Sequence, residues 1–374
     1  MRALEGSIFS HLNFSSSKKV ENLDIASTQP LFIGTFVELV KKIAELSFHN
    51  KDYLLFFRGQ RRDHLNRSGN SSFYPSIYRT KEGENLSERL LQYRFRLLDQ
   101  SSKLLIKKFE EHNIKDSINE LKRRKFIQWS ILQHYEVCDT PLLDMTQSLR
   151  VACSFALSKS EENGFIFVFG LPYISNRISI NSEQDIVNIR LINICPPQAL
   201  RPYFQEGNLV GTADVTDDYE ERTELDFKRR LIAKFEIPNT KTFWAEQESL
   251  EKYLMPEGDL ILDLCKEIIN QINEESNIQA MFPGKWLNQY EYINGKRGQE
   301  AFQILNGNEY HAFGKHAYDL DSIQIDKENN IIKFRKVGVG EEKRKLFNTL
   351  KIIDQYKYEG IESNSIKILY SRIE

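Results

Sequence analysis

Two patterns of apolar residues divide the chain into a helix-rich part and a strand-rich part. Apolar residues recurring at helical spacing predict helices over residues 35–46, 86–109, 117–135, 149–157 and 259–272. Thr35 is the expected N-cap of the first helix, with Glu38 three residues later. Short apolar runs without a helical period predict buried strands over residues 53–57 and 165–169.

From about residue 284 the pattern changes to alternating apolar and polar residues in short runs. The turn pairs Asn294-Gly295 and Asn306-Gly307 separate these runs, as in β-hairpins. Residues 365–370 form the last expected strand. We therefore predict a small antiparallel barrel or sandwich of about six to eight strands.

These patterns predict an α+β protein of three segments. Residues 1–33 are polar and mixed, and we expect a loosely attached lead-in. Residues 34–275 should form a helix-rich domain around a small mixed sheet, and residues 284–374 an all-β barrel or sandwich domain. The strands and helices do not alternate regularly, which disfavours a doubly wound parallel sheet.

Composition and charge exclude several classes of protein. The chain has 374 residues, is 40% hydrophobic and 28% charged, and carries a net charge of −2. No global basic field attracts nucleic acid, and no apolar run of about 20 residues suggests a membrane span. The start of the chain lacks a hydrophobic signal core, so we expect a cytoplasmic protein. None of the four cysteines lies in a Cys-x-x-Cys pair, which argues against a zinc site.

Candidate chemistry concentrates in residues 133–148, between two apolar segments. His134 and Asp144 lie there, and a general base oriented by a carboxylate is one interpretation. A thiol nucleophile formed by Cys138 with His134 is another. The alternatives are purely structural roles: a histidine that complements a helix C-terminus, and hydroxyls that cap the following helix.

Arg58 adds a second candidate, because it follows the first buried strand and precedes Gly59. A guanidinium at a strand end offers a planar fork of donors for phosphate or carboxylate. The structural alternative is an arginine that pairs with a neighbouring carboxylate and stabilises the fold.

Taken together, five segments resemble the FRG domain family, which is named for a Phe-Arg-Gly sequence. The segments are Phe57-Arg58-Gly59-Gln60, Tyr74-Pro75-Ser76-Ile77-Tyr78-Arg79, Gln133-His134-Tyr135, Thr140-Pro141-Leu142-Leu143-Asp144-Met145-Thr146-Gln147-Ser148 followed by Val151-Ala152 and Phe155-Ala156, and Arg201-Pro202-Tyr203-Phe204-Gln205-Glu206-Gly207. The resemblance extends over about residues 35–270. The chain departs from the family pattern at Glu136, where glycine is usual, and at Met145, where tryptophan is usual.

The motif order of the family is similar to that of ADP-ribosyltransferases, and this similarity implies roles in binding and cleaving NAD. By this analogy Arg58 holds the phosphates or ribose of NAD, and Thr146 and Ser148 support the nicotinamide ribose. Gln205 or Glu206 takes the third position, where a carboxylate stabilises positive charge on the ribose. The resemblance thus implies the catalytic set Arg58, His134, Thr146, Gln205 and Glu206, and the NAD-binding set Arg58, Gly59, Gln60, Tyr135, Asp144 and Ser148.

The function that we expect is an NAD-consuming or ADP-ribosyltransferase-like effector of a bacterial toxin or anti-phage defence system. Its acceptor would be a protein or nucleic acid, and the C-terminal domain would bind a protein partner. The alternative is a non-catalytic module that binds a nucleotide or nucleic acid, with phosphate contacts from the loop of residues 61–67. Nuclease-like chemistry by His134 and Asp144 is the third interpretation.

Overall fold

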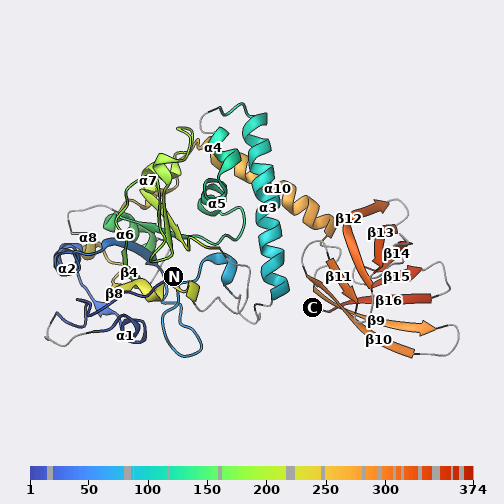
Figure 1. Cartoon of the computed structure of the whole chain (residues 1–374), viewed down its shortest axis with the longest axis horizontal. Helices are drawn as coiled ribbons and strands as arrows, with labels where there is room; N and C mark the ends of the chain where they lie inside the picture. Colours follow the sequence, from blue (N-terminus) through green and yellow to red (C-terminus); the bar gives the residue numbers. More distant parts are fainter. Residues whose placement is uncertain are drawn as a thin grey trace. The chain divides into compact units, whose positions relative to one another are not determined.

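The computed structural model divides into two compact units, Met1–Ile268 and Ile269–Glu374 (Figure 1). The structure describes residues 1–14, 20–79, 86, 88–115, 118–158, 162–215, 224–245 and 249–279, followed by the eight strands of the second unit. Side chains are described as far as residue 272, except at residues 22–24 and 88–89.

An eight-stranded mixed sheet forms the centre of the first unit. Its strand order is β1-β8-β4-β2-β3-β7-β6-β5. Only the short β1 pairs in parallel, with β8, and all other neighbours in this sheet are antiparallel. The strands are β1 (Leu31–Phe32), β2 (Leu54–Gln60), β3 (Leu143–Thr146), β4 (Gly164–Leu171), β5 (Ile178–Asn181), β6 (Ile186–Arg190), β7 (Gly207–Gly211) and β8 (Leu231–Ile237). The expected α+β class and the absence of a doubly wound sheet agree with this topology.

The helices of the first unit pack around this sheet (Figure 1). They are α1 (Asn22–Ser27), α2 (Phe36–His49), α3 (Glu88–Glu111), α4 (Ile118–Arg123), α5 (Lys125–His134), α6 (Leu149–Leu157), α7 (Arg201–Gln205), α8 (Lys241–Trp244), α9 (Glu251–Leu254) and the first part of α10 (Leu260–Gln279), which continues past Ile268 into the second unit. Among the described residues, short 3-10 helices lie at Ser76–Tyr78, Leu191–Asn193 and Phe227–Arg230. None of the described helices is both long and apolar enough to cross a membrane.

The single helix predicted over residues 117–135 is broken into α4 and α5. Arg124 has extended dihedral angles, φ −122° and ψ 104°, and separates them. Because of this break, backbone carbonyls at the end of α4 lose their intrahelical donors. The Gln128 side chain replaces one of them by donating a 2.6 Å hydrogen bond to the Leu121 carbonyl. Leu121 and Ile127 are both buried, so the bend directs both flanking segments into the core.

The packing of α6 against β2 brings the two best candidate segments of the sequence together. A Cβ atom at Gly59 would lie 1.8 Å from the backbone oxygen of Ala152, so only glycine permits this approach. Ala152 and Ala156, on α6, are fully buried in the same core cluster as Phe57. Strand β2 continues through Arg58 to Gln60, and Arg58 is paired with Phe167. The prediction that the strand ends at Arg58 was therefore wrong.

The N-terminal segment is packed against the first unit, in contrast to the loosely attached lead-in expected for residues 1–33. Met1, Leu4 and Ile8 are buried within hydrophobic core clusters of this unit. The terminal amino group pairs with Asp185 at 2.9 Å. Apolar residues scattered between polar ones gave no periodic signal, so the sequence pattern did not reveal this burial.

The second unit contains strands β9 (Gly284–Tyr292), β10 (Arg297–Leu305), β11 (Glu309–Ala312), β12 (His316–Asp326), β13 (Ile331–Gly338), β14 (Leu346–Asp354), β15 (Lys357–Ile361) and β16 (Ile366–Ile373). Every pairing is antiparallel, and β16 pairs with both β15 and β9. The predicted turns Asn294-Gly295 and Asn306-Gly307 lie outside the described residues.

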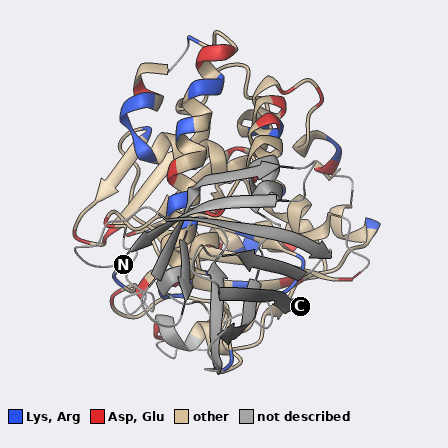
Figure 2. Cartoon of the chain, turned by 90° about the vertical axis from the view of Figure 1, so that its right-hand side faces the viewer, with Lys and Arg blue, Asp and Glu red and all other residues tan. Residues whose placement is uncertain are grey.

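Acidic and basic residues are interspersed along the helices of the first unit (Figure 2). Lys108 lies 2.9 Å from Glu267, and Lys122 pairs with Glu110. The basic run at residues 122–125 is thus partly neutralised by a neighbouring helix, which favours a solvated helix face over a phosphate-binding patch.

Candidate functional site

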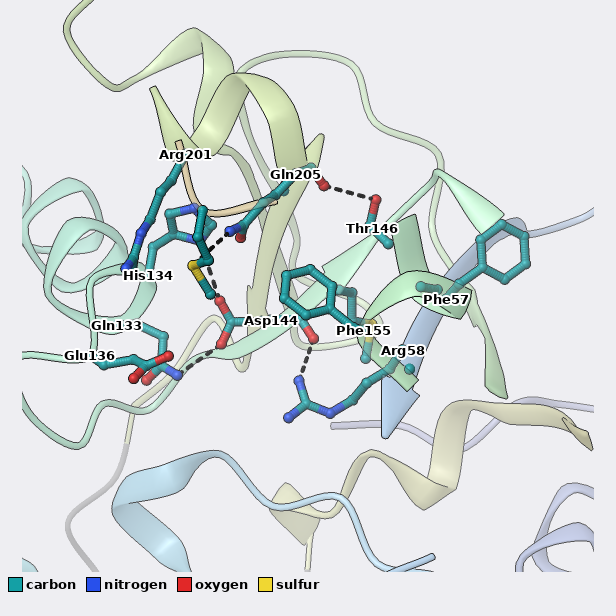
Figure 3. A pocket seen from close by; sticks show the side chains of 15 residues that line it. Phe57, Arg58, Gln133, His134, Glu136, Asp144, Thr146, Phe155, Arg201 and Gln205 are labelled. Atoms are coloured by element: carbon teal, nitrogen blue, oxygen red, sulfur yellow. Dashed lines mark hydrogen bonds and ion pairs between the residues drawn. The ribbon is translucent and has the colours of Figure 1, made fainter. Parts of the chain in front are cut away.

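A pocket of about 310 Å³ lies beside β2 and β3, and its lining comes from segments far apart in the sequence (Figure 3). This volume lies at the lower end of the range for small-molecule sites. The lining residues are Phe57, Arg58, Gly59, Gln133, His134, Glu136, Asp144, Met145, Thr146, Ala152, Phe155, Arg201, Gln205, Gly207 and Met255.

Asp144 on β3 is the centre of a polar group in this pocket (Figure 3). The Gln133 amide donates a 2.8 Å hydrogen bond to Asp144 Oδ2, and His134 Nδ1 lies 3.6 Å from Asp144 Oδ1. Burial raises the pKa of the Asp144 carboxyl, but its interactions with His134, Arg58 and Gln133 together outweigh burial. The net pKa lies below its ordinary value, so Asp144 is an ionised carboxylate at neutral pH.

Gln133 is itself held in place from outside the pocket. Its side-chain oxygen accepts hydrogen bonds from Thr140 Oγ1 at 2.6 Å and from Ser76 Oγ at 3.1 Å. These bonds fix the amide orientation, so its nitrogen is directed to Asp144. The conformation of the Asp144 carboxylate is therefore determined before any ligand binds.

The Arg58 side chain is also anchored to β3, through the backbone of Asp144. A terminal guanidinium nitrogen donates to the Asp144 carbonyl oxygen, while the buried Nε has no partner among the described residues. Burial, together with the charge of Arg79, lowers the pKa of Arg58 to about 10, although Asp144 opposes this effect. Arg58 remains a cation at neutral pH, and part of its donor capacity stays unused.

Arg201, the first residue of α7, supplies a second cation to the pocket. Its side chain forms no hydrogen bond or ion pair with any residue that the structure describes, and its Nε is buried without a partner. The guanidinium lies over the Tyr135 ring, 5.5 Å from the centroid. Its charge is thus supported by an aromatic face and not neutralised by a carboxylate, which leaves its donors for an anionic ligand.

Thr146 and Gln205 line the pocket, but Thr146 Oγ1 and Gln205 Nε2 are engaged with the backbone. Thr146 Oγ1 lies 3.1 Å from the Glu206 carbonyl oxygen, to which it donates, and accepts a hydrogen bond from the Ser148 amide at 3.0 Å. Gln205 Nε2 donates to the Leu254 carbonyl oxygen at 2.6 Å. These bonds hold the α7–β7 turn against β3 and α9, which is a structural use of both side chains.

Six of the residues proposed from the sequence line this one pocket, namely Arg58, Gly59, His134, Asp144, Thr146 and Gln205. The other four, Gln60, Tyr135, Ser148 and Glu206, are not among the lining residues. Tyr135 is buried beneath Arg201, and its hydroxyl donates to Asp259. Ser148 is the N-cap residue of α6 without a side-chain cap bond.

Glu206 lies apart from the pocket, although the motif analogy gave it a catalytic position. It is exposed and adopts the left-handed conformation with φ 46° at the end of α7. Its backbone carbonyl, not its carboxylate, contacts Thr146. The carboxylates that line the pocket are instead Asp144 and Glu136.

Sequence reasoning did not select Arg201, Gln133 and Glu136 as site residues. Arg201 and Gln133 lay within the quoted motifs, and their residue types could have identified them as candidate ligand-binding residues. Glu136 was noted only as a departure from the family pattern. Phe155 lay in the apolar segment that follows the fourth motif, whereas Met255 had no sequence signal, because an apolar residue on a helix is usually part of the core.

Cys138 does not line this pocket. Burial raises the pKa of the Cys138 thiol to about 12. The interpretation as a thiolate nucleophile is therefore not supported. Among the residues described, no group of three or more His, Cys, Asp or Glu side chains has the arrangement of a metal site.

Residues 54–164 match the family model of the FRG domain. The matched segment contains Arg58, His134, Asp144 and Thr146, and it ends before Arg201. No curated protein matches the chain. A redesigned β-barrel is found among solved structures with 14% identity and a TM-score of 0.18, covering 25% of this chain and 94% of that chain. A similarity at that score supports no conclusion about the fold or the function.

Proposed function

Because residues 54–164 form an FRG domain, we propose that its pocket binds NAD and promotes cleavage of the bond between nicotinamide and ribose. The observation that carries this proposal is the unpaired Arg201 guanidinium, in a pocket that Arg58 also lines. Two cations with unused donors suit a diphosphate, which offers several charged oxygens to guanidinium forks.

The carboxylates of the pocket suit the charge that develops during cleavage. When the glycosidic bond breaks, its electron pair leaves with the nicotinamide nitrogen and positive charge develops on the ribose. Asp144, ionised and fixed by Gln133, stabilises that charge electrostatically. Water or an acceptor side chain then forms the new bond to ribose and releases a proton. His134, adjacent to Asp144, is a positioning residue in this scheme.

We place this activity in a cytoplasmic effector of a toxin or anti-phage defence system, with a protein or nucleic acid as acceptor. The eight antiparallel strands of the second unit are proposed to close into a barrel domain that binds a protein partner. Limited proteolysis of the full chain should then release a stable fragment of about residues 284–374. Progressive degradation of that region would contradict a separate domain.

Nicotinamide release tests the proposed chemistry directly. The full chain is incubated with NAD labelled in the nicotinamide ring, with and without cell lysate as a source of acceptor. We expect release that is lost in Arg58→Ala and Arg201→Ala but retained in Lys103→Ala, an exposed lysine on α3. Absence of release from the unmodified chain in all conditions would contradict an NAD-consuming enzyme.

A non-catalytic nucleotide-binding module is the second candidate, and the cations near His64 favour it. Burial lowers the pKa of His64, and the positive charges of Arg79 and Arg58 act in the same direction, so both lie within electrostatic range of this loop. Such a cluster can bind phosphates without any chemical step. Saturable, salt-sensitive NAD binding without nicotinamide release would identify this function.

A further inference from the structure

Glu136 occupies a backbone position that normally favours glycine. It has φ 57° and follows the last residues of α5. The Val137 amide donates to the Leu132 carbonyl, and the Glu136 amide donates to the Gln133 carbonyl. These two bonds define a Schellman motif with Glu136 at the left-handed position, where a Cβ atom is disfavoured.

The same motif ends α3, and it provides an internal comparison. Asn113 has φ 54°, the Ile114 amide donates to the Phe109 carbonyl, and the Asn113 amide donates to the Glu110 carbonyl. Asparagine is the residue after glycine that best tolerates this conformation. Glutamate has no such preference, so the backbone alone does not explain Glu136.

The side chain of Glu136 explains why glutamate occupies this backbone position. It is exposed and lines the pocket, where Figure 3 shows it on the same side as Gln133. Its carboxylate has no hydrogen bond or ion pair with any described residue. An unpaired carboxylate on a strained residue at the wall of a ligand pocket points to a contact made only with the ligand.

We infer that Glu136 is a specificity-determining residue that accepts hydrogen bonds from ribose hydroxyl groups of the ligand. This inference rests on the proposed function, since it assumes a ribose-containing ligand in the pocket. A carboxylate offers acceptors on two oxygens and no donor, which suits two neighbouring hydroxyl groups. The same carboxylate repels a phosphate at the 2′ position, so the pocket should select NAD over NADP.

The chemistry of the other lining residues leaves this role to Glu136. Asp144 is occupied by Gln133 and His134, and the Thr146 hydroxyl and Gln205 Nε2 donate to backbone carbonyls. Arg58 and Arg201 are donors only. Glu136 is therefore the lining carboxylate whose acceptors are all available to hydroxyl groups.

Titration of the full chain with NAD and with NADP tests this inference. We expect the unmodified chain to bind NAD at least about ten-fold more tightly than NADP, because a carboxylate hydrogen bond and a charge repulsion both contribute. Glu136→Gln should weaken NAD binding about ten-fold and bring the affinities for the two ligands close together. Glu136→Gly should give the same change in selectivity while raising the thermal unfolding midpoint, since it relieves the left-handed strain.

Asn113→Gly is the matched control, because it changes the same backbone motif away from the pocket lining. It should leave both affinities unchanged. An unaltered ratio of NAD to NADP affinity in Glu136→Gln, with NAD still bound, would overturn the inference and leave the proposed function standing. Failure of the unmodified chain to bind NAD would overturn both.

Discussion

The hydroxyl of Tyr135 donates a 2.8 Å hydrogen bond to Asp259, which lies 124 positions further along the chain. The same carboxylate oxygen accepts the Arg201 amide at 2.9 Å. Asp259 thus connects the phenol ring with the backbone of the arginine whose guanidinium lies over that ring. Asp259 thereby positions both the start of α7 and the aromatic ring that the Arg201 guanidinium contacts.

Substitutions at Tyr135 should separate the hydrogen bond from the ring. Tyr135→Phe should lower the free energy of unfolding by about 2 kcal/mol, because a bond to a charged group is lost while Asp259 keeps its backbone donors. Its ligand affinity should be nearly unchanged. Tyr135→Leu should lower the free energy of unfolding by roughly 4 kcal/mol and also weaken binding, since Arg201 loses the aromatic face. Urea unfolding and ligand titration measure the two effects, and equal binding by both variants would contradict the role of the ring.

Gly59 should not tolerate even one added carbon atom. Gly59→Ala places Cβ 1.8 Å from the Ala152 carbonyl oxygen, so β2 and α6 must separate. We expect a loss of more than about 3 kcal/mol in the free energy of unfolding. Gly34→Ala is the control, because nothing lies within 4 Å of its added carbon, and it should be neutral or stabilise by about 0.5 kcal/mol. Equal stability of the two variants in urea would show that the close contact has no energetic weight.

His11 should make the first unit sensitive to mild acid. Burial lowers the pKa of His11 to about 4, against an ordinary value of 6.5, and the charge of Lys234 adds to this effect. The unfolded chain therefore binds more protons than the folded one between these values, and stability falls as the pH is lowered from about 6.5 to 4. The loss should approach about 3 kcal/mol. His11→Gln should flatten the profile in chemical unfolding experiments, and an unchanged slope would contradict this assignment.

Local elements of the first unit were largely predictable from the sequence. Thr35 caps α2 by accepting the Glu38 amide at 3.2 Å, as the pattern indicated, and α6 spans residues 149–157 as expected. These elements have strong helical periods or capping signals. The break at Arg124 has no such signal, because it is stabilised by the Gln128 side chain of the following helix. Strand order was not predictable, because it depends on pairing between distant segments.

The sequence predicted which residues lie in the candidate site, but not which of their polar atoms are free to bind a ligand. The motifs located Arg58, His134 and Asp144, which share one pocket. They did not show that Arg58 bonds to a backbone carbonyl or that Gln205 is bound to Leu254. Motif order gives the residue types near a site, whereas packing decides which polar atoms remain free for a ligand.

The most direct test of the central claim is calorimetric titration of the full chain with NAD, comparing the unmodified protein with Arg201→Gln. Loss of one charge-assisted contact should weaken binding about ten-fold to a hundred-fold. Lys103→Gln, which removes an exposed cation from α3, should leave the affinity unchanged. Saturable binding that is weakened only in Arg201→Gln is the result that we predict. Equal affinity of Arg201→Gln and the unmodified chain, or no saturable binding by the unmodified chain, would contradict an anion-binding pocket built around Arg201.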